Sequence, residues 1–239
     1  MKVIALVQAR MGSLRFKDKV IKKINGIPLI SILLKRLSKS KKIDEIILVT
    51  SNDKKNLPLI KIVKELGIKC FLGSEDNVLE RYYKASKKFK ADTIVRITGD
   101  CPLVDAGLVD EFVEKFNSKK IDYLSNTIHP TFPDGMDIEV FSFSSLVKCF
   151  NEAKSDYDCE HVTPYIKNTN FFEIFNVMNK KNLSSYRWTV DEESDFKVIK
   201  KIFKHFSPNI YFSWKKIELL EIKKPAIFKG NKNLIRDEG

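Results

Sequence analysis

The chain has 239 residues, of which 43% are hydrophobic and 31% charged, so it is long enough for one α/β domain with a sizeable core. Its formal net charge is +12, but most of its basic residues are lysines spread over the expected helix surfaces, and no nucleic-acid-binding motif accompanies them. These properties argue against general disorder and against direct nucleic-acid binding, and they suit an enzyme that handles anionic substrates.

Hydrophobic periodicity then predicts strands that alternate with helices over the first half of the chain. The expected strands cover residues 3–7, 46–50, 69–72 and 93–98. The expected helices start at Pro28 and cover residues 59–66, 77–89 and 108–116. Such alternation predicts an α/β fold with a mainly parallel sheet, whose ligands gather at the C-terminal ends of the strands.

After about Tyr123 the regular alternation of strands and helices ends. Short strands are expected at residues 136–141, 171–178 and 187–190, followed by a helix whose apolar side includes Phe196 and Phe206. We therefore expect one domain over residues 1–239, with a small inserted or appended lobe at about 123–186. The polar tail at 223–239 is expected to pack loosely.

The apolar runs and the cysteines predict where the protein is located in the cell. No apolar run approaches the roughly 20 residues that span a bilayer, and the apolar start is too short for a signal peptide. The four cysteines are widely spaced, which argues against a zinc site and favours reduced thiols. We expect a cytoplasmic protein without membrane insertion.

The loop that follows the first strand is the first candidate for chemistry. It carries Arg10, Arg15 and Lys19 around Gly12 and Ser13. Backbone amides and cations together suit a polyphosphate, because both can meet its oxygens. A solvated basic loop after an ordinary strand is the alternative.

Two carboxylates stand at the ends of later strands. Asp100 follows the strand at 93–98 on a Gly turn, and Asp191 ends the short strand at 187–190. Mg²⁺ prefers oxygen ligands and takes one or two protein carboxylates, with phosphate and water completing its shell. Either residue could instead cap a turn or a helix N-terminus. The sequence contains neither G-x-x-x-x-G-K-[ST] nor G-x-G-x-x-G, which excludes a P-loop and a dinucleotide-binding fingerprint.

Six ordered segments carry a resemblance to a known family. They are residues 8–19, 73–83, 96–103, 133–141, 160–165 and 187–191. Together they resemble the cytidylyltransferases that activate acidic sugars, the CMP-acylneuraminate and CMP-Kdo synthetase group, and most closely the spore coat polysaccharide biosynthesis protein F branch. The resemblance implies a Rossmann-like, GT-A-like nucleotidyltransferase fold of three α/β/α layers.

The resemblance also implies a reaction, in which an acceptor oxygen attacks the α-phosphate of CTP and pyrophosphate leaves. It implies dependence on Mg²⁺, a homodimer, and a small anionic acceptor for surface or capsule polysaccharide. Implied catalytic residues are Arg10 and Lys19, and the implied metal ligands are Asp100 and Asp191. Implied nucleotide-binding residues are Ala9, Gly12, Ser13, Arg15, Glu75, Arg81 and Arg96. Implied acceptor-binding residues are Asp134, Asp137, Glu139, His161 and Arg187.

One segment departs from the family. The family continues Arg-Leu-Pro-Gly-Lys, whereas this chain has Phe16, Lys17 and Asp18 between Arg15 and Lys19. Loss of Pro and Gly removes a fixed φ and a permissive residue, so a more mobile loop is expected.

Other functions and products remain open. One alternative is a glycosyltransferase of similar sheet architecture, for which Asp156-Tyr157-Asp158 is the only Asp-x-Asp. Another is a non-catalytic nucleotide-binding protein. The product is CMP-linked or CDP-linked, depending on the acceptor.

Overall fold

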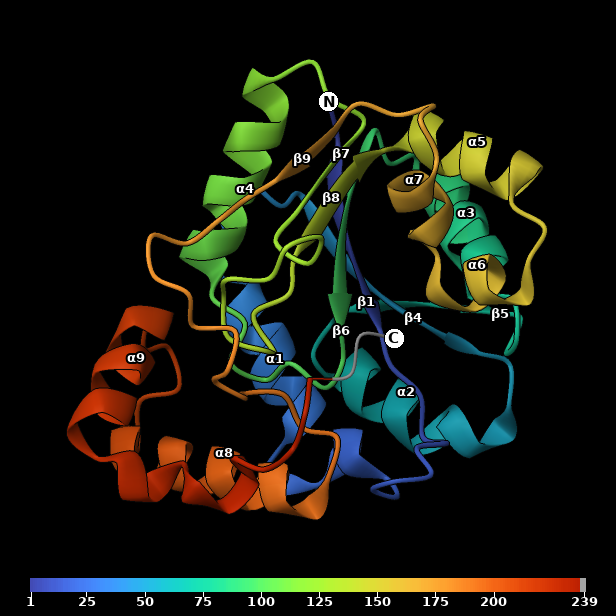
Figure 1. Ribbon diagram of the computed structural model, residues 1–239. Coiled ribbons are helices and arrows are strands. Elements are labelled where there is room, and N and C mark those ends of the chain that lie inside the picture. Colours follow the sequence, from blue (N-terminus) through green and yellow to red (C-terminus); the bar gives the residue numbers. More distant parts are fainter. Residues whose placement is uncertain (237–239) are drawn as a thin grey trace.

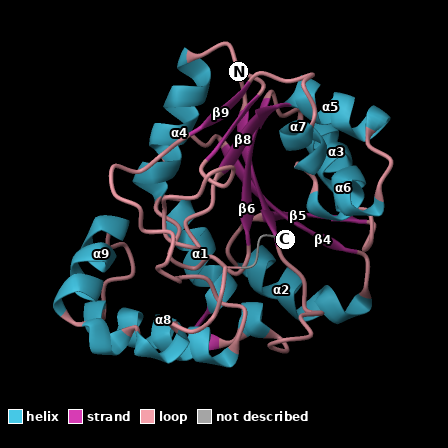
Figure 2. Cartoon of the chain, in the orientation of Figure 1, coloured by secondary structure: helices cyan, strands magenta, loops and turns pink. Residues whose placement is uncertain are grey.

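A seven-stranded sheet runs through the middle of the molecule, and helices cover both of its faces (Figures 1 and 2). The computed structural model describes residues 1–236. The strand order is β5-β4-β1-β6-β8-β7-β9, and β8 alone is antiparallel to its neighbours. The strands are β1 (Val3–Gln8), β4 (Glu45–Ser51), β5 (Lys69–Gly73), β6 (Thr93–Thr98), β7 (Tyr123–Ser125), β8 (Glu139–Ser142) and β9 (Ile174–Asn176). A separate hairpin pairs β2 (Lys23–Ile24) with β3 (Ile27–Pro28).

The helices divide between the two faces because successive residues of a strand point to opposite sides. In β1, Ile4 and Leu6 join the core under α3, α5 and α7, whereas Ala5 and Val7 join the core under α1, α4, α8 and α9. The helices are α1 (Leu29–Leu37), α2 (Leu57–Glu65), α3 (Val78–Phe89), α4 (Ala106–Ser118), α5 (Phe143–Glu152), α6 (Asp156–His161), α7 (Pro164–Asn168), α8 (Glu193–Phe206) and α9 (Trp214–Lys223). The three-layer α/β/α fold with a mostly parallel sheet is confirmed.

Three strands expected in the second half differ from the structure, and the one expected at 171–178 is only Ile174–Asn176. The strand expected at 136–141 begins only at Glu139, because the Asn126 side chain bonds Met136 O and Ile138 N in place of a neighbouring strand. The strand expected at 187–190 is also wrong: Arg187 makes one isolated bridge to Asp134, and the segment then packs between loops.

The expected lobe at 123–186 is continuous with the main sheet. It supplies β7, β8 and β9 to the sheet and α5, α6 and α7 to one face. A role for this segment in acceptor binding or dimerisation stays a prediction.

The C-terminal tail is packed rather than loose over its described part. Two turns of 3-10 helix, Pro225–Ile227 and Lys229–Asn231, bring Phe228 into the core, where it is almost fully buried. The polar composition of the tail does not predict this packing, because a single apolar residue, Phe228, anchors the tail in the core. The last three residues of the predicted tail, 237–239, lie outside the described residues.

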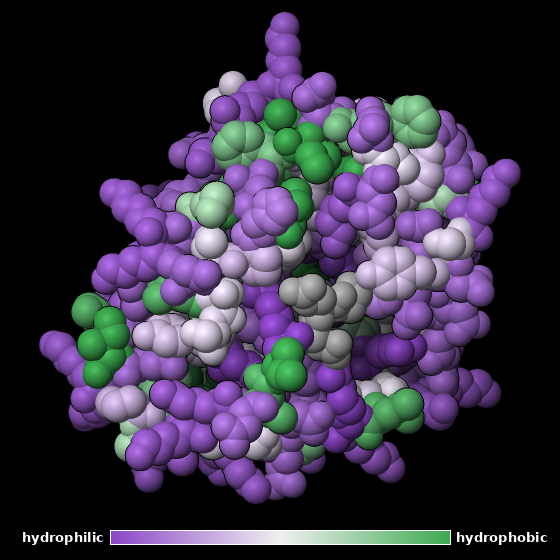
Figure 3. All heavy atoms as spheres, viewed as in Figure 1, coloured by the Kyte–Doolittle hydropathy of each residue, from purple (hydrophilic) through white to green (hydrophobic). Residues whose placement is uncertain are grey.

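No helix in the described part of the chain combines the length and apolar character needed to cross a bilayer. Hydrophilic residues dominate the face drawn in Figure 3, and the hydrophobic residues on it form small separate groups.

Candidate active site

The loop after β1 is held at its start by backbone bonds. The amide of Ala9 donates to Val49 O over 3.3 Å, and the amide of Met11 donates to Asn56 Oδ1 over 2.8 Å. Gly99 lets the loop after β6 pack against the same segment, because a Cβ there would lie 2.6 Å from the Ala9 Cβ. The structure therefore brings the two predicted loops together at the C-terminal ends of β1 and β6.

The altered centre of this loop keeps an unusual backbone conformation. Asp18, at the position where the family has Gly, adopts φ +57°. Glycine adopts this left-handed region without steric cost, and Asp is among the few other residues that tolerate it. Phe16 packs against Phe196 of α8, with 5.7 Å between ring centroids. Packing by Phe16 thus fastens the segment that has lost Pro and Gly.

The rest of the loop lies at the surface. Gly12 is exposed, and Ser13 Oγ accepts a bond from the Phe16 amide over 3.4 Å.

Lys19 joins the two predicted metal ligands. Its Nζ donates to Asp100 Oδ2 over 3.0 Å and to Asp191 Oδ1 over 2.8 Å. Burial alone would lower the pKa of Lys19, but the attraction of the two carboxylates raises it above its ordinary value. Burial would likewise raise the pKa of Asp100, yet Lys19 holds it below its usual range. Arg15 Nη2 lies 3.6 Å from Asp191 Oδ1, so residues distant in sequence form one charged centre.

This centre offers carboxylate oxygens to a cation. Asp100 Oδ2 and Asp191 Oδ1 converge on the Lys19 ammonium, so the same two atoms can face a single divalent ion. Among residues 1–236, no three or more His, Cys, Asp or Glu side chains are arranged so that together they could hold a metal ion. Two carboxylates are the usual protein contribution to a Mg²⁺ site that phosphates complete, so the donor set fits Mg²⁺.

A cleft of about 450 Å³ holds two of the predicted nucleotide-binding residues and one predicted catalytic residue. Arg10, Glu75 and Arg81 line it, and Arg10 Nη1 lies 3.7 Å from Glu75 Oε1. Arg81 is 2% exposed, and its Nε has no hydrogen-bond partner among residues 1–236. Asp156, Cys159 and Glu160 of α6 also line this cleft, although sequence reasoning assigned none of them to it. Because α6 is far from Arg10 in the chain, only the fold reveals that they line the same cleft.

Arg187 links three carboxylates beside the Lys19 centre, where the predicted acceptor-binding residues Asp134 and Arg187 lie. It donates to Asp134 over 2.8 Å, to Asp191 over 3.0 Å and to Asp195 over 2.9 Å. Asp195, which is fully buried at the start of α8, was missed by sequence reasoning because its position looked like an ordinary helix N-terminus.

Gly135 permits this arrangement with φ +94°. A Cβ there would lie 2.5 Å from Thr189 N, so only glycine allows the segment bearing Asp134 to approach the segment bearing Arg187 so closely.

Burial raises the pKa of two carboxyl groups on this side. Burial, with the nearby charge of Asp137, raises the pKa of Asp134 to about 7, although Arg236 and Arg187 oppose the rise. An ion pair with Arg187 would by itself lower the pKa of Asp134, but Arg187 is shared among three carboxylates. Burial also raises the pKa of Asp137, whose carboxylate pairs with Arg236. The site therefore carries more carboxyl groups than its cations neutralise.

Arg96 and Glu139 face each other in the sheet. Arg96 Nη1 donates to Glu139 Oε2, while Glu139 Oε1 accepts from Tyr123 Oη over 2.5 Å and from Thr163 Oγ1 over 2.6 Å. Burial would raise the pKa of Glu139, but Arg96 holds it below its usual range. Both Glu139 oxygens are thus engaged by the protein, which favours a positioning role over the predicted acceptor contact.

His161 ends α6 and packs against Tyr157, with 4.5 Å between ring centroids. The next residue, Val162, has φ +73° and ψ −49°, and the Thr163 amide donates to His161 O over 2.9 Å. This is a strained γ-turn occupied by a buried β-branched residue. The turn directs Thr163 to Glu139, and the predicted contact of His161 with the acceptor stays a prediction.

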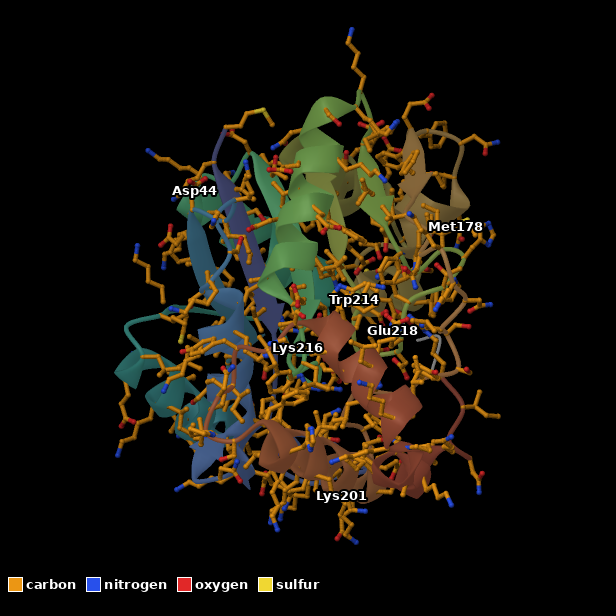
Figure 4. All side chains as sticks on the ribbon, turned by 90° about the vertical axis from the view of Figure 1, so that its left-hand side faces the viewer. Asp44, Met178, Lys201, Trp214, Lys216 and Glu218 are labelled. Atoms are coloured by element: carbon orange, nitrogen blue, oxygen red, sulfur yellow. The ribbon has the colours of Figure 1, made fainter. Side chains whose placement is uncertain are left out.

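A second, larger cleft contains none of the predicted site residues. It measures about 1020 Å³ and is lined by α4, α9 and residues 177–181, including Met178, Trp214 and Glu218 (Figure 4). The predicted site residues therefore do not lie in the more voluminous of these two clefts.

Comparisons with known proteins show the family of the chain. A family model described as Cytidylyltransferase matches residues 4–226. An uncharacterized protein of Methanocaldococcus jannaschii is 42% identical over 86% of this chain and 85% of its own length. The spore coat polysaccharide biosynthesis protein SpsF of Bacillus subtilis is 30% identical over 84% of this chain and 86% of its own length.

Among solved structures, a cytidylyltransferase from Leptospira borgpetersenii superposes with a TM-score of 0.93 and 34% identity, covering 96% of this chain and 97% of its own. The family model covers nearly the whole described chain, including every predicted site residue. This chain therefore belongs to the cytidylyltransferase family and is a nucleotidyltransferase.

Proposed function

We propose that this enzyme uses CTP and Mg²⁺ to transfer a cytidylyl group to an acidic sugar or a phosphorylated small acceptor, in the cytoplasm, for surface polysaccharide. The observation that carries the proposal is the centre in which Lys19 bridges Asp100 and Asp191 with Arg15 beside them. Cations and carboxylates at the ends of parallel strands suit a metal-bound triphosphate.

The residues divide into three groups on this proposal. Gly12, Ser13 and Arg15, with Arg10 and Lys19, would bind the triphosphate, and Ala9 would hold the start of their loop. Because the Ala9 and Met11 amides bond the protein itself, backbone amides that donate to phosphate would lie beyond Met11. The cleft with Glu75 and Arg81 would take the rest of the nucleotide, and Arg96 would support it through Glu139. Asp134, Asp137 and Arg187 would line the acceptor side, with a homodimer as the expected assembly.

Catalysis on this proposal consists of positioning and charge neutralisation. Asp100 and Asp191 would hold Mg²⁺, which when bound neutralises phosphate charge and orients the triphosphate. Arg10 and Lys19 would bind the phosphate oxygens as negative charge shifts to the departing pyrophosphate. The acceptor oxygen forms a bond to the α-phosphorus, and the bond from that phosphorus to the bridging oxygen of pyrophosphate breaks.

A product screen tests the proposal. The protein is incubated with each of the four ribonucleoside triphosphates, Mg²⁺ and a panel of acidic sugars and phosphorylated acceptors, and pyrophosphate and products are measured by mass spectrometry. Release that requires CTP and one acceptor is expected. Turnover of a sugar nucleotide without use of CTP would instead identify a glycosyltransferase.

A further inference from the structure

The C-terminal strap, defined here as residues 231–236, is fastened to the acceptor side of the site. Asn231 is buried, and its Nδ2 donates to Arg187 O over 3.1 Å and to Asp195 Oδ1 over 2.8 Å. Arg187 Nη1 in turn donates to Ile235 O over 3.2 Å. The strap therefore bonds the same arginine that organises the acceptor side.

The strap ends on a guanidinium beside the acceptor carboxylates. Arg236 Nη2 donates to Asp137 Oδ1, and its Nη1 donates to Phe132 O over 3.3 Å. Its positive charge also acts on Asp134. Residues 231–236 follow the segment 4–226 that the family model matches, so this arginine belongs to no motif in the sequence analysis.

Arg236 is better placed than Arg187 to meet an anion. Arg187 already donates to three carboxylates, and its side chain is 5% exposed. Arg236 pairs with one carboxylate, that of Asp137, and because the two side chains are 13% and 29% exposed the pair borders solvent. An anionic acceptor that approaches Asp134 and Asp137 needs a cation to offset their charge, and a guanidinium binds a carboxylate through two parallel hydrogen bonds.

We propose that Arg236 is a specificity residue of the acceptor site, which binds the carboxylate of an acidic acceptor. This inference rests on the proposed function, since it assumes an acidic acceptor.

The test compares Arg236→Gln and Arg236→Lys with the wild type and with Lys232→Gln, which removes one exposed positive charge from the same strap. KM for CTP and KM for the acidic sugar that supports most pyrophosphate release in the wild type are measured for each, starting with 3-deoxy-manno-octulosonate. The same sugar with its carboxylate converted to the amide serves as the uncharged probe. Thermal unfolding checks that each variant folds.

We expect Arg236→Gln to raise KM for the acidic sugar about 10- to 100-fold, with partial recovery in Arg236→Lys and no change in KM for CTP. Arg236→Gln should leave KM for the amide unchanged, and Lys232→Gln should behave as the wild type. Equal KM values for the acidic sugar in wild type and Arg236→Gln would overturn the inference and leave the proposed function intact. If the wild type binds CTP but turns over no acidic sugar, the acidic acceptor is wrong, and the inference falls with it.

Discussion

Replacement of Glu139 by Gln tests whether Glu139 stabilises the fold or binds the acceptor. The change leaves Arg96 buried opposite a neutral amide, whereas Tyr123 and Thr163 can still donate to the amide oxygen. Breaking a buried ion pair by removal of one partner costs about 3–5 kcal/mol. Because two of the three hydrogen bonds survive, we expect Glu139→Gln to lower the free energy of unfolding by about 3 kcal/mol.

Urea unfolding at pH 7 measures this change, and a double-mutant cycle with Arg96→Met isolates the pair. Asp137→Asn is the matched control, because Asp137 pairs with Arg236 at the edge of the site, and we expect a loss of about 1 kcal/mol or less. A loss below about 1 kcal/mol in Glu139→Gln, together with a raised KM for the acceptor, would refute the positioning role.

The pH dependence of the same variant has a defined sign. Since the folded protein holds the pKa of Glu139 below its usual value, the carboxylate contributes stability above the unfolded pKa of about 4.3. That contribution is lost as pH falls through the folded pKa. The stability difference between wild type and Glu139→Gln should therefore shrink in acid, and a difference that grows as pH falls would contradict the assignment.

Three further predictions concern the loop and the site. Asp18→Ala should unfold about 1 kcal/mol more easily than Asp18→Gly in urea, because only glycine takes φ +57° without strain; equal stabilities would contradict this. Gly135→Ala should lose about 3 kcal/mol, since its Cβ would meet Thr189 N, whereas Gly12→Ala, with no heavy atom within 4 Å of its Cβ, should change by less than about 0.5 kcal/mol. Lys19→Met should slow pyrophosphate release about 100- to 1000-fold with its fold retained by circular dichroism. Lys17→Met, an exposed change in the same loop, should stay within about twofold of the wild-type rate, and similar rates for both variants would remove Lys19 from catalysis.

Much of the first half of the fold could be predicted from periodicity. The strand at 93–98 is found at Thr93–Thr98, and the expected helix end at Gly67 is a cap in which Ile68 N bonds Val63 O. These elements depend on local residue patterns, which a sequence displays directly. The approach of the loops bearing Lys19 and Asp100 also follows, because the parallel strands β1 and β6 end at one edge of the sheet, whereas Asp191 reaches this centre from a segment that is not a strand.

The second half depends on contacts that no local pattern contains. Asn126 replaces strand pairing at Met136 and Ile138, so a segment with strand-like composition is not a strand. Glu139 looked like a member of an acceptor face, but its partner Arg96 lies on β6, 43 residues earlier in the chain. Arg236 reaches Asp137 across 99 residues, which only the packed tail makes possible.

Pyrophosphate release by Asp100→Asn tests the central assignment most directly. The asparagine keeps the shape of the side chain but removes the charge that faces Lys19 and would face Mg²⁺. With CTP, Mg²⁺ and the acceptor found in the screen, we expect the wild type to release pyrophosphate and Asp100→Asn, folded by circular dichroism, to release none above background. Mg²⁺-dependent release by Asp100→Asn at the wild-type rate would contradict the assignment of this centre as the site of cytidylyl transfer.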